Sequence, residues 1–152
     1  MDKFQKVDKY GQGKVISQLV KIFNGKSLDF SQHYIDKSTV DIEMKVTTTN
    51  NVYNYVIEAK DRYYHHDAFN GEWMIEKAKY DELMKKEGKA YYANTFNDDY
   101  LVVWDLNKLD ITELKKEVKE LPYITLSPEF GKKQKEVYYL PIDKACYCAK
   151  FI

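Results

Sequence analysis

The chain has 152 residues, of which 44% are hydrophobic and 32% are charged, a composition that excludes a disordered protein or one made of membrane-spanning segments. Lysine and arginine together number 24, and so do aspartate and glutamate, so the net charge is zero and a uniformly basic nucleic-acid-binding domain is excluded. We expect one domain over residues 1–152, without a signal peptide and without a membrane partner.

The first part of the chain predicts one helix followed by three strands. An apolar stripe with helical spacing predicts a helix over residues 10–24. Three stretches follow in which residues alternate in polarity or are rich in β-branched and aromatic types, as strands are. These predicted strands cover residues 28–35, 39–46 and 52–60.

The middle of the chain predicts a crossover helix and two further strands. The helix is expected near residues 71–87, and the strands at Lys89–Phe96 and Tyr100–Leu106. The order helix, three strands, helix, two strands predicts an α/β (α+β) fold, in which helices flank a central mixed β-sheet.

The last third of the chain predicts a short helix and a late strand. Asp110 and Glu113 have the spacing of a capping box, which predicts a helix that begins there. Pro122 is expected to end that helix, because the residue before a proline disfavours the helical conformation. Residues 136–140 have the composition of a strand.

Charged residues on two of the predicted strands are expected to meet. Polarity alternates in both strands, so Asp41 lies on the polar face of one, and Glu58 and Lys60 share a face of the next. A four-residue loop between the strands sets Thr47 opposite Val52. Counting back along this hairpin places Asp41 directly opposite Glu58.

Two facing carboxylates and a nearby lysine indicate a metal-dependent phosphodiesterase. The carboxylates repel each other, and a divalent cation between them removes the repulsion. Mg²⁺ takes such oxygen ligands, activates water and stabilises charge on a phosphoryl group. Lys60, on the same face, would position or deprotonate the water.

Asp41 followed by Glu58-Ala59-Lys60, on adjacent strands between two helices, resembles the PD-(D/E)XK nuclease superfamily. This superfamily includes restriction endonucleases and Holliday-junction resolvases. The resemblance covers roughly residues 10–106 and implies a restriction-endonuclease-like αβββαβ core. It implies that Asp41, Glu58 and the carbonyl of Ala59 bind Mg²⁺, or Mn²⁺ in its place, and that Lys60 is the catalytic lysine. DNA is the implied substrate, cut to leave a 5′-phosphate.

Two positions depart from the superfamily's pattern. Val40 stands where the motif has a proline, and the middle of the first helix offers Gln18 where many members have a metal-site glutamate. A non-catalytic nucleic-acid-binding or assembly module that keeps the fold is therefore the alternative function, and a plain interaction domain is a third. A homodimer would supply a second active site and a wider basic surface.

The predicted crossover helix has a lysine in its apolar stripe. At about 100° per residue, Trp73, Tyr80, Leu83 and Met84 form the stripe, and Lys77 projects inside it. Either the lysine stem packs while the ammonium reaches water, or the ammonium reaches the phosphate at the metal site. The second interpretation makes Lys77 a catalytic residue.

Three other features have a functional and a structural interpretation. The sequence His65-His66-Asp67 provides either metal ligands or a surface loop near the substrate. The basic residues within 132–135 form either a solvated loop or a contact to phosphates. Asp29 with Glu43 and Lys45, also on neighbouring predicted strands, is a rival to the carboxylate–lysine set, but Lys45 leads into another strand instead of the crossover helix.

The two cysteines indicate the expected compartment. Cys146 and Cys148 are separated by one residue, which is too close for an unstrained disulfide. Two cysteines are also too few for a disulfide framework. We therefore expect reduced thiols and a cytoplasmic location.

Overall fold

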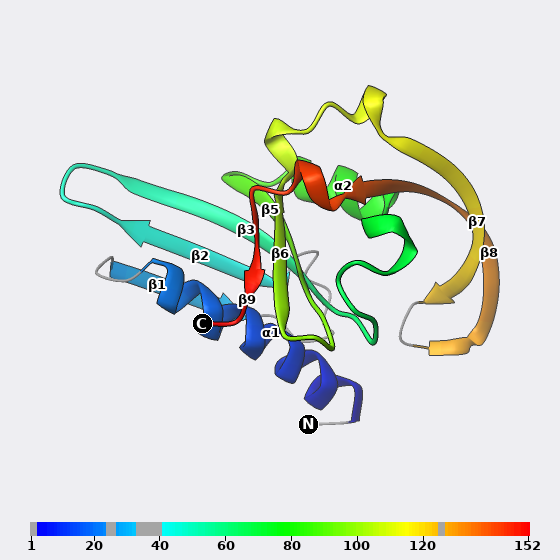
Figure 1. Ribbon diagram of the computed structural model, residues 1–152, viewed down its shortest axis with the longest axis horizontal. Helices are drawn as coiled ribbons and strands as arrows, with labels where there is room; N and C mark the ends of the chain where they lie inside the picture. Colours follow the sequence, from blue (N-terminus) through cyan, green and yellow to red (C-terminus); the bar gives the residue numbers. More distant parts are fainter. Residues whose placement is uncertain (1–2, 24–26, 33–40, 125–126) are drawn as a thin grey trace.

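A six-stranded sheet crosses the middle of the molecule in the computed structural model, which describes residues 3–23, 27–32, 41–124 and 127–152 (Figure 1). Its strands lie in the order β1 (Ser27–Gln32), β2 (Ile42–Thr47), β3 (Val52–Asp61), β5 (Lys89–Thr95), β6 (Tyr100–Asp105) and β9 (Tyr147–Lys150). Neighbouring strands pair antiparallel, except β3 and β5, which are parallel.

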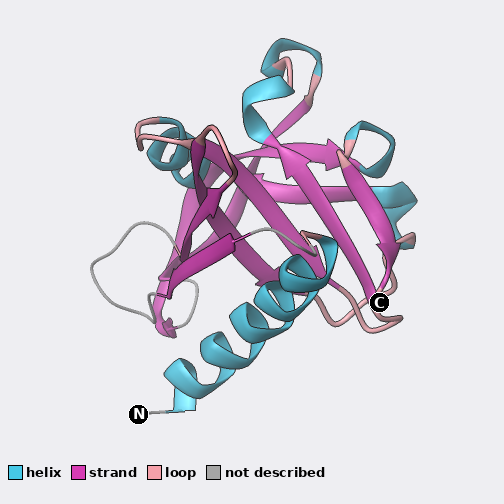
Figure 2. Cartoon of the chain, turned by 90° about the vertical axis from the view of Figure 1, so that its left-hand side faces the viewer, coloured by secondary structure: helices cyan, strands magenta, loops and turns pink. Residues whose placement is uncertain are grey.

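Helix α1 (Lys3–Ile22) runs across one face of this sheet, over β3 and β5 (Figures 1 and 2). Val15 and Leu19 of the helix are buried there against Ile42, Met44 and Ile57 of the strands. The apolar residues of β2 alternate with exposed polar ones, so one face of the strand packs on the helix. Within the described ranges, no helix has the length and apolar character needed to cross a membrane.

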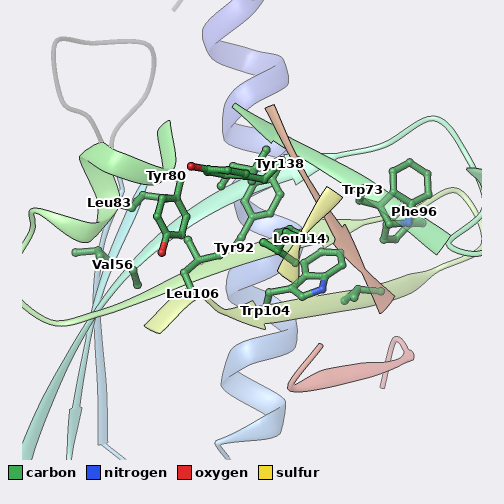
Figure 3. Close-up of a cluster of buried hydrophobic side chains, with 14 residues drawn as sticks. Val56, Trp73, Tyr80, Leu83, Tyr92, Phe96, Trp104, Leu106, Leu114 and Tyr138 are labelled. Atoms are coloured by element: carbon green, nitrogen blue, oxygen red, sulfur yellow. The ribbon is translucent and has the colours of Figure 1, made fainter. Parts of the chain in front are cut away.

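The opposite face of the sheet is covered by helix α2 (Lys77–Met84) and by a second, three-stranded sheet. This second sheet has the order β4 (Glu72–Glu76), β8 (Ser127–Pro141) and β7 (Lys115–Ile124). The core between these layers is aromatic (Figure 3). The rings of Tyr80 and Tyr138 meet edge to face at 5.5 Å, and the indole of Trp104 donates to the Pro141 carbonyl at 2.8 Å.

Most of the predicted elements of the main sheet are confirmed. The first helix, the three strands that follow it and the two strands after the crossover are all present. The predicted hairpin register is also confirmed, because Thr47 pairs with Val52 and Ile42 with Ile57. Residues 33–40, which include parts of two predicted strands, lie outside the described residues. The predicted α/β fold class with a central mixed sheet is confirmed.

The predicted helix over 71–87 is wrong in its first half. Residues 72–76 form β4, in which Trp73 and Ile75 are buried and their neighbours are half-buried, an alternation with the period of a strand. Gly71, at φ +68°, adopts a left-handed conformation that turns the chain directly before this strand. The helix begins only at Lys77.

The predicted helix that begins at Asp110 is also wrong. The Asp110 side chain does accept the N–H of Thr112 at 3.0 Å, but it caps only a short 3-10 turn at Ile111–Glu113. Residues 115–124 form β7 instead. Pro122 is tolerated there because β7 is the edge strand of its sheet, where a missing N–H does not interrupt a central ladder. The late strand is present as part of the longer β8.

Candidate active site

Asp41 and Glu58 are held together at the end of the β2–β3 hairpin. The observed register ends at the Ile42–Ile57 pair, and Asp41 and Glu58 are the next residue on each side. Asp41 Oδ2 accepts the backbone N–H of Ala59 at 2.9 Å, which orients its carboxylate toward β3. The side chain of Glu58 is only 15% exposed, so the pair lies largely out of water.

The surroundings of Glu58 favour its protonated form when no cation is bound. Burial, followed by the negative charge of Asp41, raises the pKa of Glu58 well above its usual range, and a hydrogen bond with Asp41 acts in the same direction. Lys79 and Lys60 act against this shift. Glu58 Oε2 is buried and has no hydrogen-bond partner within the part of the chain described. Two adjacent carboxyl groups with an unsatisfied buried oxygen fit a divalent cation, which Asp41, Glu58 and the Ala59 carbonyl would hold.

Lys60 lies two residues beyond Glu58 on the same face of β3. It is half-buried and stands opposite Asn94 in the parallel register with β5. Burial, and then the positive charge of Arg62, lower the pKa of Lys60, while Glu58, Glu76 and Asp41 partly compensate. The structure therefore brings three of the predicted site residues, Asp41, Glu58 and Lys60, to one place.

Lys77, the fourth predicted catalytic residue, does not reach this place. Its Nζ contacts Asp81 Oδ2 at 2.7 Å, one turn along α2, and its side chain is 40% exposed. Two residues of the predicted stripe, Tyr80 and Leu83, are buried as expected, but Trp73 belongs to β4 and Met84 is exposed. The buried side of α2 is therefore narrower than the predicted stripe and does not include Lys77.

Lys79 occupies the position that had been expected for Lys77. Its Nζ lies 3.7 Å from Glu58 Oε2 and 3.6 Å from Glu82 Oε2. Burial alone would lower the pKa of Lys79, but Glu58 and Glu82 raise it, so it remains charged. Lys79 is one turn before the fully buried Leu83, and this spacing is the sequence signal that it faces inward.

A cavity of about 140 Å³ opens beside the carboxylate pair. Its charged lining consists of Glu58, Lys60, Arg62, Glu76 and Lys79. Three cations and two acids make this lining positive, more so when Glu58 is protonated. An anionic group would therefore be attracted into the cavity.

One wall of the cavity comes from the second sheet. Leu121 and Pro122 of β7 line it, and β7 and β8 together form a long curved ribbon at this end of the molecule (Figure 1). Lys135 of β8 pairs with Glu76 Oε1 at 3.3 Å and is largely buried. Residues 132–135, predicted as a basic loop, are therefore part of a strand, and Lys135 has an internal partner.

The stretch His65-His66-Asp67 contains two residues that could bind a metal ion and one whose side chain has other contacts. Ligand atoms of His65, Asp67 and Asp98 lie within 4.8 Å of one another, so these residues could hold a metal ion at a second place. His66 does not join them as a ligand: its Nδ1 contacts Asp98 Oδ2 at 2.6 Å, and its ring stacks on Tyr100 at 3.6 Å.

The first helix supplies no acid to the pair from the side chains described. These run from residue 10 to residue 22 and include no aspartate or glutamate. Gln18 is buried, and its Oε1 accepts the N–H of Ile152 at 2.8 Å, so it fixes the end of the chain against α1.

The fold is similar to that of a solved structure, although comparison of the sequence with known families and proteins gives no match. No protein-family model matches the chain, and no curated protein matches its sequence. The structure resembles that of Hjc, a Holliday junction resolvase from the archaeal hyperthermophile Archaeoglobus fulgidus. The TM-score is 0.50 at 11% identity, over 93% of this chain and 91% of the resolvase. The fold that the predicted resemblance implied, that of a Holliday-junction resolvase, is thereby confirmed.

Proposed function

We propose that the chain is a DNA endonuclease of the PD-(D/E)XK type that depends on Mg²⁺ or on Mn²⁺ in its place. The observation that carries this proposal is the direct meeting of the Asp41 and Glu58 carboxyl groups, with Lys60 on the same face of β3. Asp41, Glu58 and the Ala59 carbonyl would hold the metal ion. When bound, the ion supplies an activated water and stabilises negative charge on the phosphoryl group.

The other residues of the cavity act on charge and position. Lys60 orients the attacking water and adds positive charge where negative charge develops in the transition state. Lys79 holds Glu58 and limits its protonation. The partly enclosed cavity strengthens each of these interactions, because the local dielectric is lower than that of bulk water.

The test is cleavage of supercoiled plasmid and of branched DNA with Mg²⁺ or Mn²⁺. Lys60→Ala should slow cleavage by about 10²-fold or more, with DNA binding unchanged within a few fold. The matched control is Lys45→Ala, which changes the exposed lysine of the Glu43-Met44-Lys45 triplet and should cut at the wild-type rate. Wild-type cleavage by Lys60→Ala would contradict the assignment.

A non-catalytic nucleic-acid-binding module is the second candidate. The lack of an acid among the described side chains of α1 favours it. This candidate predicts salt-dependent DNA binding without cleavage in either metal. A homodimer would add a second copy of the site, and sedimentation of the protein with and without DNA tests that proposal.

A further inference from the structure

Arg62, the single arginine of the chain, is held in one orientation next to Lys60. Its Nε donates to Asn94 Oδ1 at 2.8 Å, and its Nη2 donates to the Met74 carbonyl and to the Tyr92 hydroxyl, each at 2.9 Å. A guanidinium has five N–H donors. The two on Nη1 make no hydrogen bond with the described residues.

Nη1 of Arg62 is not fully buried. In the part of the chain described, the buried side-chain polar atoms without a hydrogen bond are Glu58 Oε2 and Asn94 Nδ2, and Nη1 is not among them. Arg62 also lines the cavity that contains Glu58 and Lys60. A guanidinium with free donors forms strong, charge-assisted hydrogen bonds to phosphate oxygens.

The hydrogen bond that orients Arg62 leaves another buried polar group without a partner. Because a guanidinium only donates, Asn94 must present Oδ1 to it, and Nδ2 is directed elsewhere. Asn94 is fully buried, and its Nδ2 forms no hydrogen bond with the described residues. An unsatisfied buried amide destabilises the folded state, and such local conflicts are typical of functional sites.

We propose that Arg62 binds a phosphodiester oxygen of the nucleic-acid backbone through Nη1 and is the phosphate-binding residue of the cavity, next to the catalytic Lys60. Glu58 and Lys60 share one face of β3, which ends at Asp61. Arg62 follows directly, where its backbone N–H donates to the Thr95 carbonyl at 2.8 Å, and its side chain lines the same cavity as Glu58 and Lys60. The metal-binding carboxylate, the lysine and the phosphate clamp are then presented in this order by one stretch of chain. The inference rests on the proposed function and deepens it, because it names the residue that receives the substrate's backbone.

The first test uses the wild-type chain without divalent metal. Since the chain has one arginine, a protein labelled with ¹⁵N-arginine gives guanidinium signals from Arg62 alone. A thymidine tetranucleotide without terminal phosphates is titrated in EDTA, and inorganic phosphate is titrated in a parallel sample. The Nη signals should shift and saturate with the tetranucleotide. Unchanged signals, or a shift with inorganic phosphate alone, would overturn the proposal.

The second test compares two charge-removing variants by the salt dependence of binding to a labelled duplex. Arg62→Gln should lower the slope of log K against log salt by about 1, the loss of one phosphate contact. Lys150→Gln, an exposed change on the edge strand β9, should keep the wild-type slope. An unchanged slope for a folded Arg62→Gln overturns the proposal, and the wild-type titration decides the matter if that variant does not fold.

Neither test requires cleavage, so the two proposals can fail separately. Cleavage that depends on Lys60, together with Arg62 signals that do not respond to the tetranucleotide, would overturn the phosphate contact and leave the nuclease function standing. A response of Arg62 without cleavage in either metal would support the phosphate contact and overturn the nuclease function.

Discussion

Asp41 Oδ2 accepts the N–H of Ala59 at 2.9 Å, so the carboxylate that directly precedes β2 is oriented by the backbone of β3, between Glu58 and Lys60. This hydrogen bond fixes the direction of Asp41 independently of any cation. Asparagine has the same shape and can accept the same N–H through its amide oxygen. Replacing Asp41 by Asn therefore removes the charge and keeps the geometry.

Asp41→Asn should not destabilise the protein in EDTA at pH 8. It removes a repulsion worth roughly 0.2–1 kcal/mol between facing carboxylates, so the melting temperature should hold or rise by about 1–4 °C. Mg²⁺ should raise the melting temperature of the wild type and not that of the variant. A clear fall in the metal-free melting temperature would show instead that Asp41 has a structural ion pair.

The pKa of Glu58 predicts that stability without metal falls as the pH rises. Burial and the charge of Asp41 raise this pKa in the folded state, so the folded protein binds a proton that the unfolded chain releases above pH 4.5 or so. Because the folded state then holds more protons, the free energy of unfolding decreases from that pH up to the raised pKa and is constant above it.

Urea unfolding in EDTA between pH 4.5 and pH 8 measures this slope. Glu58→Gln should be less sensitive to pH than the wild type over this interval. Glu43→Gln, an exposed change on β2, should follow the wild type. Parallel pH dependences for the wild type and Glu58→Gln would contradict the assignment of the titrating group.

Lys79, and not Lys77, should affect the protonation of Glu58 and the stability that depends on it. Lys79→Met leaves the buried Glu58 carboxylate with less compensation, which should cost about 1–3 kcal/mol at pH 8 and extend the decline in stability to higher pH. Lys77→Met removes an exposed contact with Asp81, so stability and cleavage should stay near the wild type. The same urea titration compares the two variants, and equal behaviour would contradict the placement of Lys79.

The carboxylate pair could be predicted from the sequence because local information determines it. Polarity alternates strictly along β2, and a short loop fixes the register with β3. The first residue of α2 could not be predicted in the same way. Trp73 and Tyr80 are seven residues apart, which is compatible with one helix face, and only the buried Ile75 distinguishes a strand.

The surroundings of Arg62 also lie beyond what the sequence could predict. Its three partners, Met74, Tyr92 and Asn94, belong to β4 and β5, and their contacts depend on how distant elements pack. The second sheet was missed for a related reason. Pro122 argues against a strand unless the strand is at an edge, and edge position is a property of the tertiary fold.

Gly88 is expected to be essential for the start of β5, which carries Tyr92 and Asn94 to the cavity. It has φ +103°, and a Cβ at this position would lie 2.6 Å from the backbone oxygen of Asn54 in β3. Gly88→Ala therefore combines an unfavourable backbone conformation with a clash against the backbone, and should destabilise the protein by about 2–3 kcal/mol. At roughly 2–4 °C per kcal/mol, this is a fall of about 4–12 °C in melting temperature.

The control is Gly13→Ala in α1, where an added Cβ meets nothing within 4 Å. That change should stabilise the helix by about 0.5–1 kcal/mol. Thermal unfolding of both variants checks the pair, and a Gly88→Ala protein as stable as the wild type would show that β5 does not start from this close approach.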